Sequence, residues 1–221
     1  MTPRMDIEQA RFNMIEQQIR PWDVLDSQVL QLLSLVQREL FVPTAHRALA
    51  FVDMEIPLPG GQHMLAPKVE ARLLQDLAVH KHEKVLEIGT GSGYMAALLA
   101  RRAQSVLSLE INPELAAFGR ANLERAGIYN VEVREADGSV GLSSGAPFDV
   151  ILLSGSVAQL PQHLMAQLKI GGRLATIVGN DPVMCATLVS RLGESEYRSQ
   201  ARWDTVADRL QNFPEPSRFV F

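Results

Sequence analysis

The sequence predicts an α/β protein with a doubly wound, mostly parallel sheet and helices on both faces. Two observations carry this prediction. From residue 83 onward, short β-rich runs alternate with helical segments, and before residue 83 the apolar residues recur mainly at helical spacing. We therefore expect an N-terminal helical cap, a parallel sheet, and an antiparallel C-terminal strand pair formed by the two β-rich runs at 185–192 and 197–206.

The N-terminal cap is predicted as two helices between Ile7 and about Phe41. The first carries Phe12, Ile15 and Ile19 on one face, and Pro21 separates it from the second. Asp26 or Ser27 is a suitable N-cap for the second helix. The prolines and the Gly-Gly pair of 51–67, "FVDMEIPLPGGQHMLAP", indicate an irregular surface segment, and "KVEARLLQDLAV" returns to helical period.

In the alternating part, each β-rich run is followed by a helical or turn segment. The expected strands are 84–89, 105–111, 131–136, 149–154 and 172–179, and the expected helices are 92–102, 113–126 and 159–168. Asn112 and Pro113 supply an N-cap and first position for the middle helix, and Gly127 ends it.

Composition indicates one soluble domain in a reducing compartment. The chain has 221 residues, 47% of them hydrophobic and 21% charged, with a net charge of −4, so nucleic acid is not an expected partner. No apolar run is long enough to cross a membrane. A single cysteine, Cys185, excludes an internal disulfide, and the polar N-terminal segment lacks the pattern of a signal peptide. We expect a cytoplasmic protein.

Three glycines follow the first strand of the alternating part, where open α/β sheets bind ligands. The stretch "VLEIGTGSGY" places Gly89, Gly91 and Gly93 around Thr90 and Ser92, directly before Tyr94. This G-x-G-x-G spacing is neither the dinucleotide fingerprint nor a P-loop. A ligand without phosphates therefore fits better, although a generic strand-helix turn is the alternative.

Acidic residues stand at the ends of the neighbouring strands. Glu110, followed by Ile111, ends the second strand and can accept hydrogen bonds from both hydroxyls of a ribose. Asp137 and Gly138 end the third strand and could hold an adenine edge. Glu87, near the end of the first strand, could face a positively charged part of the ligand. These residues together indicate a nucleoside carrying a positive charge.

The five stretches "VLEIGTGSGY", "LSLEIN", "READG", "APFDVILLSG" and "LKIGGRLATIVG" resemble, in order and spacing, the motifs of S-adenosylmethionine-dependent methyltransferases of Rossmann-like fold. The resemblance implies S-adenosyl-L-methionine as the cofactor. It also implies that the residues just named, from Glu87 to Gly138, bind that cofactor.

Further stretches, including "RELFVPTAHRALAFVDMEIPL" and "GQHMLAPKVEARLL", look like the protein-L-isoaspartate O-methyltransferase family over residues 14 to 180. The family resemblance implies protein repair by methyl transfer to the free carboxylate of isoaspartyl residues in damaged proteins. It divides the single domain into a helical cap with the acceptor-side loop (1–67), a cofactor-binding core (68–180) and a C-terminal extension (181–221).

The acceptor-side loop departs from the family pattern. The family reads approximately G-Q-T-I-S-x-P, whereas this chain reads "GQHMLAP", so that His63 and Leu65 replace a threonine and a serine. One hypothesis makes His63 an N–H donor in an active carboxyl methyltransferase. The other is a paralogue that binds the cofactor but methylates another acceptor, or none.

Other acceptor-side candidates are weaker. The family's A-A-P stretch after the fourth strand is altered to "SGSVAQLP". Asp53, Ser154 and Ser156 are nonetheless candidates to contact the acceptor. His80 and His82 lack a third ligand in the sequence, so no metal site is expected.

Overall fold

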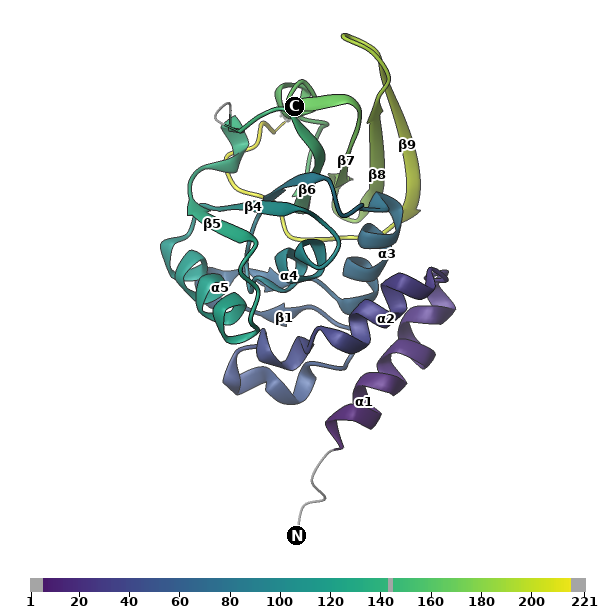
Figure 1. Cartoon of the computed structure of the whole chain (residues 1–221), viewed down its shortest axis with the longest axis vertical. Helices are drawn as coiled ribbons and strands as arrows, with labels where there is room; N and C mark the ends of the chain where they lie inside the picture. The colour runs from purple at the N-terminus through teal and green to yellow at the C-terminus, as the bar shows by residue number, and fades with distance from the viewer. Residues whose placement is uncertain (1–5, 143–144, 216–221) are drawn as a thin grey trace, which may run out of the picture.

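A computed structural model describes residues 6–142 and 145–215. Within these residues seven strands form one sheet in the order β5-β4-β3-β6-β7-β8-β9, with β3 to β7 parallel and β8 and β9 antiparallel (Figure 1). The strands are β3 (Lys84–Ile88), β4 (Ser105–Glu110), β5 (Val131–Glu135), β6 (Phe148–Val157), β7 (Leu168–Asn180), β8 (Val183–Arg191) and β9 (Tyr197–Asp204). The predicted fold class, including the antiparallel C-terminal pair, is confirmed.

The helical segments follow the predicted order. They are α1 (Ile7–Asn13), continued by a π-helix at Met14–Ile19 and a 3₁₀ turn at Arg20–Trp22, then α2 (Ser27–Leu35), α3 (Pro67–Leu77), α4 (Tyr94–Ala100), α5 (Pro113–Arg125) and α6 (Gln162–Met165), with 3₁₀ turns at Arg38–Leu40, Thr44–Leu49, Pro59–Gly61 and Gly138–Val140. Two short strands, β1 (Ile56–Pro57) and β2 (His63–Met64), pair antiparallel inside the irregular segment 51–67.

Capping residues set several helix ends as predicted. Asp26 caps α2 by accepting from the backbone N–H groups of Gln28 and Val29. Asn112 caps α5 in the same way, and Gly127, at φ 66°, follows its last turn.

Three details of the helical prediction are wrong. Phe12 is 58% exposed, so only Ile15 and Ile19 of that group are buried. The second helix ends at Leu35, because Val36 is extended and the chain then turns to bury Arg38. The helix expected at 159–168 is only the four-residue α6, because β6 continues to Val157 and β7 already begins at Leu168.

The two faces of the sheet are covered unequally. On one face, sheet residues such as Val85 and Val150 belong to a core shared with the N-terminal helices and with α3, α4 and α5. On the other, Leu86 and Ile151 pack with α6 and with Phe213, near the end of the described chain. Helices thus lie on both faces, but the second depends on the C-terminal segment for part of its cover.

The sheet order places a topological switch beside β3. β4 lies on one side of β3 and β6 on the other, so the strand order reverses at β3. α/β proteins bind ligands outside the carboxyl ends of the strands at such a point. Among the described residues no helix is long and apolar enough to cross a membrane. The division at residues 67 and 180 stays a prediction, and its terminal parts 1–5 and 216–221 lie outside the described residues.

Candidate active site

The glycine loop between β3 and α4 has a backbone that requires glycine. Gly89, Gly91 and Gly93 have φ values of 92°, 50° and 82°. A Cβ on Gly93 would lie 3.0 Å from the carbonyl oxygen of Gly119, so this turn packs against α5 with no room for a side chain. The loop is therefore a rigid backbone surface at the end of β3.

Glu110 ties the end of β4 to this loop. Its Oε2 accepts from the backbone N–H of Gly91 at 2.9 Å, and its Oε1 accepts from that of Asn112 at 3.0 Å. Glu110 and Ile111 line a cavity together with Gly89 and His63. The second strand end and the glycine loop thus face the same space, as predicted.

Asp137 and Gly138 stand at the end of β5. Asp137 Oδ1 accepts from the backbone N–H of Ser139, and its Oδ2 accepts from Asn212 Nδ2, both at 2.8 Å. Despite the opposing effect of partial burial, these hydrogen bonds hold the pKa of Asp137 below its usual range. A Cβ on Gly138 would lie 2.3 Å from Ile88 Cγ2, so glycine is required there as well.

Adjoining cavities connect these strand ends into one crevice. The cavity at Asp137 shares Gly89, Glu110 and Gln211 with the cavity at His63. That cavity in turn shares Gly89 and Ser154 with a third, which Thr90, Ser92 and Leu65 also line.

Glu87 lies beneath the crevice rather than on its surface. It is completely buried, and it accepts from Ser108 Oγ at 2.6 Å and from Ser154 Oγ at 2.9 Å. Ser108 Oγ also lies 2.6 Å from Thr90 Oγ1. Burial raises the pKa of Glu87 to about 8, against the lowering effect of the two serine hydroxyls. Its role toward a positive charge stays a prediction.

Tyr94 contributes its backbone to the loop, while its side chain packs into the N-terminal core. Its ring meets Phe41 edge-on at 5.4 Å, and the Arg38 guanidinium lies 5.0 Å from its centroid. Arg38 also pairs with Glu70 and donates to the carbonyl oxygens of Ala50 and Leu65. This buried pair, which we did not predict, fastens the acceptor-side loop to α3.

The predicted acceptor-side residues separate in the structure. His63, in β2, and Ser154, in β6, both line the crevice. Asp53 instead forms a 2.8 Å ion pair with Lys68. Ser156 is completely buried and donates through Oγ to the carbonyl oxygen of Ala207 at 2.9 Å. Assignment of Asp53 to the acceptor stays a prediction, and the geometry brings His63 and Ser154 together without it.

The segment 205–213, called here the C-terminal strap, runs back after β9 toward the other end of the sheet (Figure 1). Its residues Leu210 and Gln211 line the crevice. Asp208 meets His63 at 2.8 Å and Asn212 meets Asp137 at 2.8 Å. Leu210 lies 3.1 Å from the position of a Cβ on Gly89. The sequence does not predict the strap, because "TVADRLQNF" has no regular period. Its only signal is the polar, non-periodic run itself.

A glycine loop after β3, with acids at the ends of β4 and β5, defines the class of α/β methyltransferase folds, and similar solved structures agree. A Plasmodium falciparum protein solved with S-adenosyl-L-homocysteine has a TM-score of 0.78 at 18% identity, covering 92% of this chain and 97% of its own. A solved protein-L-isoaspartate O-methyltransferase has a TM-score of 0.76 at 24% identity, and the match covers 91% of this chain and 64% of the solved chain.

Sequence comparison identifies the family. The family model described as Protein-L-isoaspartate(D-aspartate) O-methyltransferase (PCMT) matches residues 9–206. Protein-L-isoaspartate O-methyltransferase 2 of Marinobacter nauticus is 40% identical over 200 residues, covering 90% of this chain and 91% of the relative. The enzyme of that name from Koribacter versatilis is 39% identical over 181 residues, covering 82% of each. The chain belongs to the protein-L-isoaspartate O-methyltransferase family, which confirms the predicted resemblance.

Proposed function

We propose that this protein is an S-adenosylmethionine-dependent carboxyl O-methyltransferase that acts on the free carboxylate of isoaspartyl residues in damaged proteins. The observation that carries the proposal is the family match over residues 9–206, which spans both the cofactor crevice and the loop that bears His63. Because the match includes that loop, a paralogue with another acceptor or with none is less well supported.

The residues of the crevice fit the cofactor. We assign Glu110 to the ribose hydroxyls and Asp137 and Gly138 to the adenine edge, and the support is that these residues line adjoining cavities. The glycine loop leaves bare backbone where a side chain would fill the crevice, since a Cβ on Gly91 would lie 3.3 Å from Leu58. S-adenosylmethionine supplies an electrophilic methyl group when it is bound.

The acceptor chemistry needs positioning more than proton transfer. A carboxylate is already ionised at pH 7, so the reaction requires no general base. The protein must hold the acceptor oxygen in line with the methyl group and remove water from it. His63 lies at the crevice with 37% of its side chain exposed, so it can reach both the crevice and a large acceptor. Leu65 is 7% exposed and offers only apolar cover.

A peptide pair tests this function. The protein is incubated with methyl-labelled S-adenosylmethionine and an isoaspartyl peptide, and separately with the same peptide carrying a normal aspartyl residue. We expect base-labile label in the isoaspartyl peptide only. Equal labelling of both peptides, or of neither, would contradict the proposal. A cytoplasmic location remains our prediction; the single cysteine, Cys185, is compatible with a reducing compartment.

A further inference from the structure

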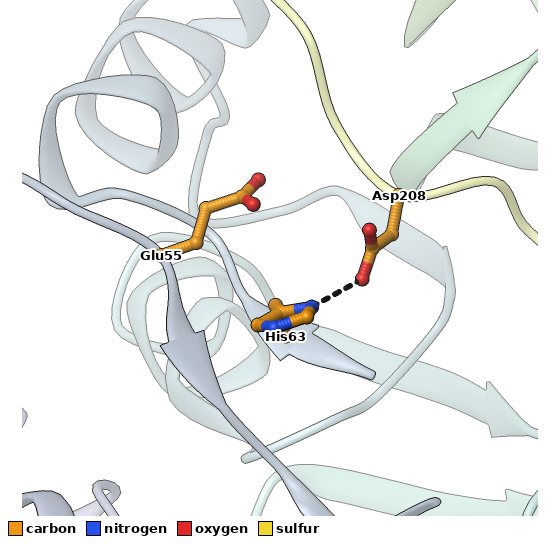
Figure 2. A group of neighbouring side chains, drawn as sticks. All are labelled: Glu55, His63 and Asp208. Atoms are coloured by element: carbon orange, nitrogen blue, oxygen red, sulfur yellow. Dashed lines mark hydrogen bonds and ion pairs between the residues drawn. The ribbon is translucent and has the colours of Figure 1, made fainter. Parts of the chain in front are cut away.

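His63 has a charged partner from the far end of the chain. Its Nδ1 lies 2.8 Å from Asp208 Oδ2, across 145 positions of sequence (Figure 2). An ionised carboxylate only accepts hydrogen bonds, so Nδ1 carries the proton of this contact. Among the described residues Nε2 of His63 has no hydrogen-bond partner. The ring therefore has one nitrogen fixed and the other free.

Asp208 is held in place by the backbone around it. The N–H of Ser156 donates to the Asp208 carbonyl oxygen at 2.8 Å, and the N–H of Leu210 donates back to the Ser156 carbonyl oxygen at 2.9 Å. Arg209, between them, donates to the carbonyl oxygen of Gly179 at 2.8 Å. Gly155 permits this approach, because a Cβ there would lie 3.1 Å from the Asp208 carbonyl oxygen. The carboxylate is thus presented to His63 from an ordered segment.

Two carboxylates face the His63 ring. Glu55 is a second acid beside the ring, and Glu55, His63 and Asp208 each place a ligand atom within 4.8 Å of the others (Figure 2). Burial and the Asp208 charge raise the pKa of Glu55, while His63 lowers it. These two carboxylates face the ring from the loop before β1 and from the C-terminal strap. Without a positive ring they would repel an acceptor carboxylate.

We propose that Asp208 is a positioning residue that orients His63, so that the imidazolium donates from Nε2 to the acceptor carboxylate. This inference rests on the proposed function and deepens it. One charged donor would replace the two hydroxyls that the family's loop carries, and charge-assisted hydrogen bonds are stronger than neutral ones. In a neutral ring Nδ1 keeps its proton in the hydrogen bond to Asp208, so Nε2 carries no proton and cannot donate to the acceptor.

The variant Asp208→Asn tests the proposal, with Asp204→Asn as its control. Asp204 is an exposed acid at the end of β9, four positions away, so its variant removes the same charge outside the site. At about pH 6 we expect Asp208→Asn to raise the KM for the isoaspartyl peptide about tenfold. The control should match the unaltered protein, and both variants should keep the affinity for S-adenosylhomocysteine. An unchanged KM in Asp208→Asn would overturn the proposal.

A further measurement separates positioning from a structural role. Nitrogen NMR of labelled histidine should show neutral His63 protonated at Nδ1, and this signature should be lost in Asp208→Asn. A neutral ring protonated at Nε2 in the unaltered protein would overturn the proposal regardless of activity.

Other outcomes separate the positioning role of Asp208 from a metal site and from a failure of the proposed function. If Glu55, His63 and Asp208 instead hold a divalent cation, a chelator will abolish methyl transfer and added zinc will restore it, which would overturn the donor role. If the protein binds S-adenosylhomocysteine but never labels the isoaspartyl peptide, the proposed function fails, and the acceptor role of His63 fails with it. If the unaltered protein labels the isoaspartyl peptide normally and Asp208→Asn leaves the KM unchanged, only the positioning role of Asp208 fails.

Discussion

At the ends of β3 and β4, hydrogen bonds join residues of two consecutive strands, whereas the contacts around the acceptor-side loop join it to separate parts of the chain. Gly91 and Glu110 are 19 positions apart, and Glu87 and Ser108 are 21 apart. On the acceptor side, Arg38 meets Glu70 across 32 positions and His63 meets Asp208 across 145. The part of the crevice between β3 and β4 therefore follows from the order of the parallel strands, while the acceptor side depends on a few charged contacts between separate parts of the chain.

The largest effect is expected from Arg38→Met, which breaks the buried pair of the acceptor side. Arg38 is completely buried and Glu70 is 3% exposed, so the variant leaves an unpaired buried carboxyl. We expect the free energy of unfolding to fall by about 3–5 kcal/mol in chemical denaturation. Arg47→Met, at an exposed position of the same region, is the matched control. Equal stability of the two variants would show that the pair does not fasten the loop.

The next effect is on the pH dependence of stability, and it comes from Glu87, the buried acid beneath the crevice. The folded-state pKa of Glu87 is raised from 4.5 to about 8, so the folded protein binds the proton more tightly than the unfolded chain. Its contribution to stability is present below pH 4.5 and is lost as pH rises toward about 8. The slope is at most about 1.4 kcal/mol per pH unit.

The variant Glu87→Gln should remove this part of the pH dependence and leave the rest. Burial raises the pKa of Glu70 to about 7. Its contribution to the free energy of unfolding should therefore also fall as pH rises, equally in the unaltered protein and in Glu87→Gln. Denaturation at several pH values measures the difference. Parallel stability curves for the two proteins would contradict the assignment of a raised pKa to Glu87.

A smaller effect is expected where Glu110 meets the ribose. Glu110→Ala should weaken binding of S-adenosylhomocysteine by about 1–3 kcal/mol, measured by calorimetry, because it removes a charged acceptor. The control is Glu114→Ala, an exposed acid in the first turn of α5. Unchanged affinity in Glu110→Ala would remove that residue from the cofactor site.

The smallest effect is expected from Asn212→Ala, which removes the hydrogen bond between the C-terminal strap and Asp137 at the end of β5. Its hydrogen bond to Asp137 is exposed, so the loss of cofactor affinity should be below about 1 kcal/mol. The same calorimetry measures it. A loss of affinity greater than that of Glu110→Ala would mean that the strap contributes more to cofactor binding than the strand ends do. The cofactor crevice would then depend on a distant contact, as the acceptor side does.

Prediction from sequence succeeds where one local pattern decides the geometry. Asn112 and Pro113 begin α5, and Gly89, Gly91 and Gly93 form the turn, because these residue types have few alternatives there. It fails for the helix expected at 159–168, where strand pairing with β7 competes with helix propensity. Asp53 illustrates a different limit, since a loop carboxylate can pair with any nearby cation, and Lys68 is its partner.

By itself, the sequence determined the strand and helix order, the glycine turn and the acids at the strand ends, because hydrophobic period and turn chemistry act over a few residues. Only the tertiary structure decided that Asp208 faces His63, that Arg38 meets Glu70, and that the C-terminal strap covers the crevice. Those contacts join residues far apart along the chain, and no local preference selects one distant charged partner over another until the packed core fixes their positions.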